Sequence, residues 1–74
     1  MKVEPSKLKR GDIIALMRHS GRRPETEVLR VLIMYATKRE FEGQILFSKI
    51  SGYNVGETYG TNFAGSVPSN WRIV

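Results

Sequence analysis

The sequence predicts an all-β protein: one domain, residues 1–74, folded as a small five-stranded antiparallel barrel or a strongly bent sheet. Three observations predict this fold class. The apolar segments have the length of strands and are rich in β-branched residues, turns that contain glycine separate them, and no segment is a convincing helix. A closed barrel is expected because an open sheet of this size leaves unpaired edges.

The first two strands are expected on either side of a basic loop. Residues 12–18 (DIIALMR) follow a Gly-Asp turn signal and contain two β-branched isoleucines, although their Ala-Leu-Met also suits a helix. Residues 19–27 (HSGRRPETE) contain glycine and proline without periodicity, so they indicate a loop with a cationic front. Residues 27–37 (EVLRVLIMYAT) form the longest apolar segment, and their β-branched residues favour a long central strand over the alternative helix.

Residues 37–49 (TKREFEGQILFSK) carry the clearest strand pattern. After a polar turn at Lys38 and Arg39, apolar residues and Gly43 alternate with polar ones, and only Leu46 interrupts the polar face. This period is typical of a half-buried strand that forms an antiparallel hairpin with the segment before it. A glycine inside such a strand predicts a bulge or a sharp bend at residue 43.

The remaining segment contains more turns than strand. Residues 50–66 carry four glycines, which predict a short strand at residues 53–55, a tight turn at residues 56–57 and an irregular loop. A further turn precedes a final short strand at residues 71–74 (WRIV). Trp71, the only tryptophan, is expected to plug the end of the core rather than to present an exposed stacking surface.

The segment GSVPSNW, residues 65–71, resembles SH3 domains. In that family a Gly, an apolar residue, Pro, Ser or Ala, Asn and an aromatic residue mark a one-turn 3₁₀ helix before the last strand. The resemblance implies an SH3-like barrel with this turn, and a partner-binding role for Pro68, Asn70 and Trp71. The acidic loop that contacts ligands in the family is replaced here by the basic residues 18–24 (RHSGRRP), so SH3-like topology is expected rather than proline-rich peptide binding.

A second similarity concerns the order of the segments along the chain. A strand after Gly-Asp, a long strand, an F-x-G strand, the segment GYNVGE and an aromatic end are together similar to small uncharacterised proteins encoded by bacteriophages. That family implies no known chemistry, and it hints at a chain that contacts one partner.

The composition argues against an enzyme. The chain has no cysteine and one histidine, which excludes disulfides, thiolate zinc sites and a transition-metal site made by histidine alone. His19 and Ser20 are adjacent in a loop with no third group to orient them, and no phosphate-binding glycine motif is present. We therefore expect no catalysis, cofactor or metal. The absence of a signal-like apolar region predicts a soluble cytoplasmic protein without membrane contacts.

The aromatic residues divide into two expected groups. Tyr35, Phe41 and Phe47 lie in the strongest strand patterns and are expected in the core. Tyr53 and Tyr59 lie in the glycine-rich segment and are expected to be exposed.

The net charge of +5 favours an anionic partner. The first hypothesis is a binding module whose basic loop docks an acidic surface of a larger protein, one from a host or one that handles nucleic acid. The alternatives are a nucleic-acid-binding barrel and a homo-oligomer that buries Leu32, Met34 and Leu46. The candidate partner-binding residues are Arg18, Arg22, Arg23, Lys38, Arg39, Tyr53, Tyr59, Asn70, Trp71 and Arg72.

Overall fold

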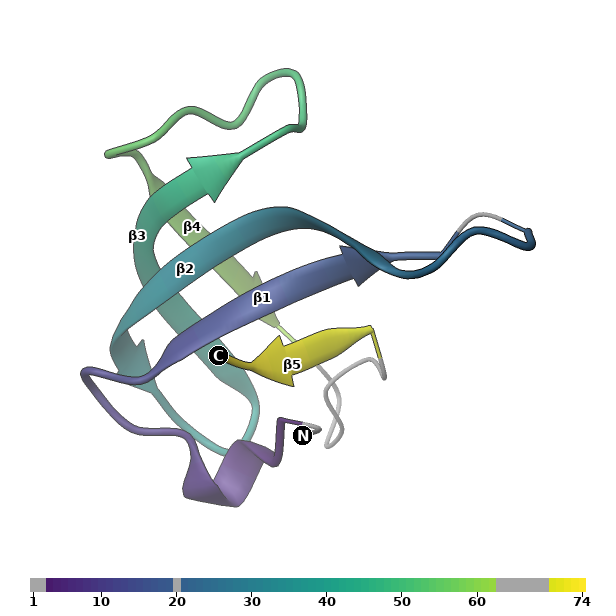
Figure 1. Ribbon diagram of the computed structural model, residues 1–74. Coiled ribbons are helices and arrows are strands. Elements are labelled where there is room, and N and C mark those ends of the chain that lie inside the picture. The colour runs from purple at the N-terminus through teal and green to yellow at the C-terminus, as the bar shows by residue number, and fades with distance from the viewer. Residues whose placement is uncertain (1–2, 20, 63–69) are drawn as a thin grey trace.

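The computed structural model describes residues 3–19, 21–62 and 70–74. They form one antiparallel sheet of five strands in the order β4-β3-β2-β1-β5 (Figure 1), which confirms the all-β class. A single turn of 3₁₀ helix, η1 (Pro5–Lys7), precedes the sheet. The strands are β1 (Ile13–Arg18), β2 (Thr26–Ala36), β3 (Glu40–Ser48), β4 (Thr58–Asn62) and β5 (Trp71–Ile73).

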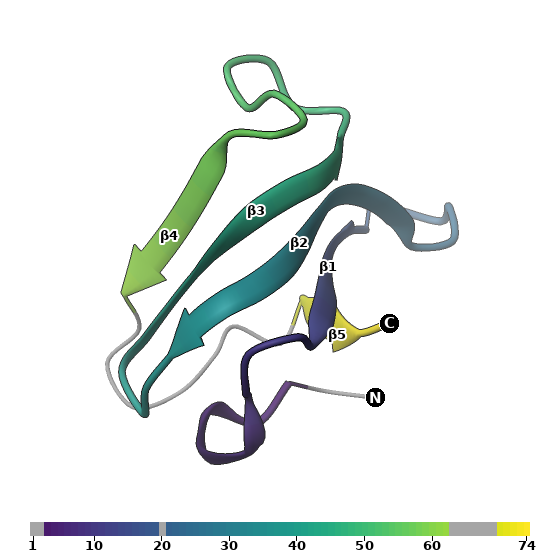
Figure 2. The same ribbon diagram turned by 90° about the vertical axis from the view of Figure 1, so that its left-hand side faces the viewer.

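The sheet is not closed into a barrel or strongly curled, so this part of the prediction is wrong. The strands β4 and β5 lie at opposite edges (Figure 2), and no ladder joins them in the described residues. The edge strands are also short, with five and three residues against eleven in β2. Closure would need a continuous ladder between these two edges.

The three longer strands match their sequence patterns. The segment predicted as a strand at residues 27–37 is strand β2 rather than helix, and it pairs with β1 on one side and β3 on the other. The hydroxyl oxygen of Thr37 accepts hydrogen bonds from the backbone N–H groups of Arg39 and Glu40, both at 3.2 Å. These bonds hold the tight β2–β3 turn at Lys38 and Arg39 where the sequence predicts it.

The fourth strand lies later in the chain than predicted. Residues 53–55 are not a strand, and the strand is instead β4, at residues that the sequence pattern assigned to an irregular loop. Gly52 and Gly56 have φ angles of +93° and +92° and belong to turns, as expected of glycine there. Gly60 instead pairs with Glu42 inside the β3–β4 ladder. The spacing of the glycines alone therefore wrongly indicated a loop at residue 60. The 3₁₀ turn predicted before the last strand lies outside the described residues.

The bulge predicted at residue 43 lies in the partner strand β2, where Met34 is the extra residue, and Gly43 marks a close approach between the two strands. Gly43 pairs with Ile33, and the register shifts between Ile33 and Tyr35. A Cβ atom at this position would collide with the backbone carbonyl of Leu32 and with the side chain of Val31. Only glycine allows the two backbones to approach this closely.

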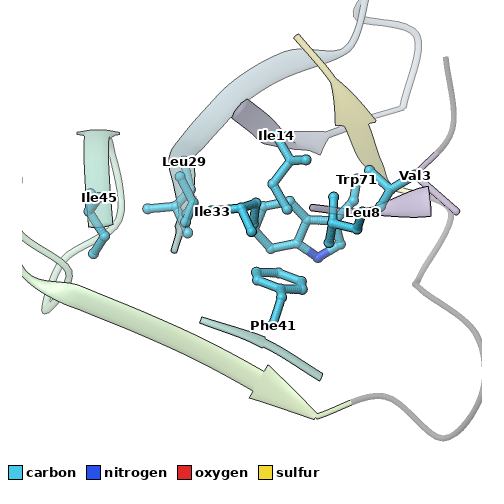
Figure 3. Close-up of a cluster of buried hydrophobic side chains, with 9 residues drawn as sticks. Val3, Leu8, Ile14, Leu29, Ile33, Phe41, Ile45 and Trp71 are labelled. Atoms are coloured by element: carbon cyan, nitrogen blue, oxygen red, sulfur yellow. The ribbon is translucent and has the colours of Figure 1, made fainter. Parts of the chain in front are cut away.

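The core lies on one face of the sheet and is closed by an aromatic cluster (Figure 3). The ring of Phe41 lies 5.3 Å from the Trp71 indole at 85°, an edge-to-face geometry, and Tyr59 lies 5.8 Å from the indole. Trp71 is 3% exposed, which confirms its expected role in the core. The buried cluster consists of Val3, Leu8, Ile14, Leu29, Val31, Ile33, Phe41, Ile45 and Trp71.

Several burial predictions are corrected by the structure. Tyr35 and Phe47, expected in the core, are 53% and 37% exposed, because they pair with Glu42 and Arg30 on the face of the sheet away from the core. Tyr59, expected to be exposed, is half-buried against Phe41 and Trp71. No helix in the described part of the chain is long and apolar enough to cross a membrane.

Candidate anion-binding recess beside the β1–β2 hairpin

The β1–β2 hairpin extends away from the rest of the sheet (Figure 1). The described residues of its connection are all exposed, and Arg22 and Arg23 lie there while Arg18 ends β1. The predicted cationic loop therefore protrudes. We call Arg18, Arg22 and Arg23 the basic hairpin.

An open recess of about 330 Å³ lies beside this hairpin. We call it the hairpin recess; its lining residues are Arg18, Arg23, Pro24, Thr26, Val28 and Lys49. Three of them are cations and none is a carboxylate. A surface of this kind attracts an anionic group.

Lys49 joins the recess because the β2–β3 ladder continues past the end of β3. Its backbone N–H donates a 2.8 Å hydrogen bond to the carbonyl of Val28, which places residue 49 beside the start of β2. Lys49 was not among the residues predicted for the site. The predicted hairpin could have indicated it. If the two strands pair in register from the turn at Lys38, residue 49 lies opposite residue 28.

The carboxylates nearest to the recess along the chain are engaged elsewhere. Glu25 pairs with Arg72 at 3.2 Å. Glu27 accepts two hydrogen bonds from Arg30, at 2.6 Å and 2.9 Å, and this hydrogen bonding, followed by charge attraction, raises the pKa of Arg30. Arg18, Arg23 and Lys49 consequently have no ion pair among the described residues.

A register shift explains how Glu27 reaches Arg30. Residues three apart on a regular strand point to opposite faces. Here the partners of Leu16 and Met17 are Leu29 and Glu27, so Val28 is an extra residue in β2. A bulge of this kind turns Glu27 to the same face as Arg30 and leaves Val28 in the wall of the recess.

Phe47 forms an apolar surface next to the recess. The ammonium nitrogen of Lys49 lies 5.9 Å from the centre of the Phe47 ring, which is the range of a cation–π contact. The ring is also partly exposed, and so is the adjacent Leu46. Lys49 therefore contacts both the cationic recess, which it lines, and the accessible ring of Phe47.

Of the other cations predicted for the site, Arg72 contacts the hairpin through Glu25, whereas Lys38 and Arg39 lie far from it. Lys38 and Arg39 lie on the β2–β3 turn, at the opposite end of β2. Arg72 lies in β5, where it pairs with Glu25 and donates a 3.2 Å hydrogen bond to the carbonyl of Trp71. The predicted set of cations thus divides between two ends of the sheet.

The remaining predicted residues contribute less to this surface. Asn70 is exposed, and its carbonyl accepts a 2.8 Å hydrogen bond from the backbone of Met17. Trp71 is buried, so its ring is not available to a partner. Tyr53 is exposed as predicted and packs edge-on against Tyr59 at 5.5 Å. Burial, followed by the neighbouring Tyr53, raises the pKa of the Tyr59 phenol.

The described residues contain no cluster of three or more His, Cys, Asp or Glu side chains that could hold a metal ion. Comparison of the chain with protein-family models, curated proteins and solved structures found no match. The geometry and charge of the hairpin and its recess are therefore the features that indicate a function.

Proposed function

We propose that this protein is a small non-enzymatic binding module that docks an acidic surface of a larger protein through the basic hairpin. The observation that carries the proposal is the combination of protrusion and unbalanced charge. Arg18, Arg22 and Arg23 are exposed, and the acidic side chains of the same hairpin are paired with Arg30 and Arg72. Arginine is a favoured anchor at protein interfaces, and unpaired charge at a protruding tip speeds encounter with an opposite charge.

A nucleic-acid ligand is less well supported by the distribution of charge. Binding along a strand uses a cationic track with exposed aromatic rings on which successive bases stack. Here the basic hairpin and the Lys38–Arg39 turn lie at opposite ends of β2, and Tyr59 is partly buried. Of Tyr53 and Tyr59, the two rings expected to be exposed, only Tyr53 is.

The proposal is tested by capture from a nuclease-treated lysate on immobilised protein. An Arg22→Glu/Arg23→Glu variant should lose an acidic partner that the unmodified protein retains. Lys38→Glu/Arg39→Glu, which reverses the same number of charges at the other end of β2, should retain it. Equal capture by both variants would remove the hairpin from the interface. Gel shifts with single- and double-stranded DNA and RNA, with a steep loss of affinity in salt, would favour nucleic acid instead.

A second candidate function is a homo-oligomer, which the exposed apolar residues favour. Met34 and Leu46 are 47% and 38% exposed, and Tyr35 and Phe47 lie on the same uncovered face of the sheet. Self-association would bury this surface. Sedimentation equilibrium measures it directly: a concentration-independent monomer mass excludes this candidate.

A further inference from the structure

We infer that the hairpin recess holds a single carboxylate of the acidic partner, and that Phe47 receives an apolar side chain two residues away from that carboxylate. The inference rests on the proposed function, because it takes the partner to be an acidic protein. It adds the chemistry of the recognised segment: an extended stretch in which an acidic residue, any residue and an apolar residue follow each other.

The lining of the recess suits a carboxylate. The side chains of Arg18, Arg23 and Lys49 supply three cationic donors, and the Thr26 hydroxyl is a further donor in the same wall. Buried Val28 and the Pro24 ring make the rest of the wall apolar. Hydrogen bonds between ionised groups are the stronger kind, and an apolar wall weakens their competition with water.

The position of Phe47 is the reason why we expect an apolar side chain in the partner segment. Its ring centre lies 5.9 Å from the Lys49 ammonium. A carboxylate oxygen that accepts a hydrogen bond of about 2.8 Å from this ammonium therefore lies within about 9 Å of the ring centre. Alternate side chains of an extended segment point the same way and are spaced by about 7 Å. A side chain two residues away from a carboxylate in the recess can therefore reach Phe47.

A sugar-phosphate backbone fits this arrangement less well. It presents regularly repeated charges, which are matched by a row of cations. Beyond the hairpin recess, the next pair of predicted cations is Lys38 and Arg39 at the far end of β2. Between them lie the exposed apolar Leu46 and Phe47, and Arg30 is paired with Glu27.

The test is a titration of the ¹⁵N-labelled full chain with a capped Ala-Asp-Ala-Leu-Ala peptide, followed by amide chemical shifts. We expect shifts at residues 18, 26, 28 and 47–49. Replacing Asp by Asn in the peptide should abolish the shifts. Replacing Leu by Ala should weaken binding about fivefold, since about 1 kcal/mol of apolar contact is lost. Shifts scattered over the chain, equal binding of the Asn peptide, or no binding at millimolar peptide would each overturn the inference.

Variants of the protein separate the two parts of the recess. Lys49→Gln should weaken the peptide about fivefold, within the range of a single exposed ion pair. Lys38→Gln also removes one positive charge, at the other end of β2, and should leave the affinity for the peptide unchanged. Phe47→Ser should make the Leu and Ala peptides bind equally, and dispersed amide spectra check that each variant is folded. Equal weakening by Lys49→Gln and Lys38→Gln would show a general charge effect and overturn the site.

Two outcomes distinguish this inference from the proposed function. If Arg22→Glu/Arg23→Glu abolishes partner capture while Lys49→Gln and Phe47→Ser leave it unchanged, the hairpin docks the partner and the inference is wrong. If inorganic phosphate or a short oligonucleotide binds the recess more tightly than the Asp peptide, the assignment to an acidic protein segment is overturned.

Discussion

The aromatic cluster around Trp71 and the basic hairpin are built from opposite kinds of contact. The cluster packs aromatic rings from three strands, β3, β4 and β5, against one another. The hairpin is formed by two consecutive strands, and its connection is exposed throughout its described residues. Burial of apolar side chains stabilises the fold, whereas charge on an exposed connection contributes little to the free energy of unfolding.

The largest expected effect comes from removing the indole. Trp71→Ala should lower the free energy of unfolding by about 3–5 kcal/mol, because it leaves a cavity beside Phe41 and Tyr59. That is a large share of the roughly 4–11 kcal/mol typical of a domain of this length. Urea unfolding followed by circular dichroism measures the change.

The matched variant for this experiment lies in the other region. Arg22→Glu/Arg23→Glu changes two exposed residues and should alter the free energy of unfolding by no more than about 0.5 kcal/mol. A hairpin variant that destabilises the protein as much as Trp71→Ala would erase the contrast between the two regions.

A smaller effect is expected at the close approach between β2 and β3. Gly43→Ala should cost about 1–3 kcal/mol, because the new methyl group meets the Leu32 backbone carbonyl and the strands must shift. Gly60→Ala, in β4, is the control, since the nearest atom to its added Cβ is at 3.6 Å, an ordinary contact. Similar urea midpoints for the two variants would contradict the close packing at residue 43.

The smallest effect concerns the pH dependence of the cluster. Burial raises the pKa of Tyr59 above its usual value of 10.0, so the folded state favours the neutral phenol. This contribution to stability is complete below pH 10, where the unfolded phenol is also neutral, and is lost as the pH rises through the folded pKa. Unfolding in urea between pH 9 and 11 should show this decline, and Tyr59→Phe should reduce it.

Tyr35→Phe is the control for the pH experiment, because that ring lies on the uncovered face of the sheet. It should leave the pH dependence of unfolding as steep as in the unmodified protein. A slope that Tyr59→Phe does not change would show that the phenol gains nothing from its place in the cluster.

The strands were predictable where their patterns were local. Residues 13–18 and 26–36 contain enough β-branched residues, and residues 40–48 alternate clearly enough, to be recognised without a partner strand. In β4 the glycine at residue 60 looked like a turn signal, and only pairing with Glu42 makes it part of a strand. A short edge strand depends on its neighbour more than on its own residues.

The candidate site was predictable in part for the same reason. Arg18, Arg22 and Arg23 are close in the chain, so their grouping in one hairpin follows from the turn between two strands. Lys49 is distant in the chain, and its place in the recess depends on its hydrogen bond to Val28. Phe47 was assigned to the core because alternation alone does not reveal the register shift opposite Arg30 and Val31.

The all-β class, the three longer strands, the basic hairpin and the burial of Trp71 could all be predicted from the amino-acid sequence. These properties follow from side-chain period, turn chemistry and charge, which act over a few neighbouring residues. The three-dimensional arrangement was needed to show that the sheet stays open, that β4 begins at residue 58, and that Lys49 lies between the recess and the Phe47 ring. Each of these depends on which strands pair and in which register, and two sheets with the same local patterns can differ in both.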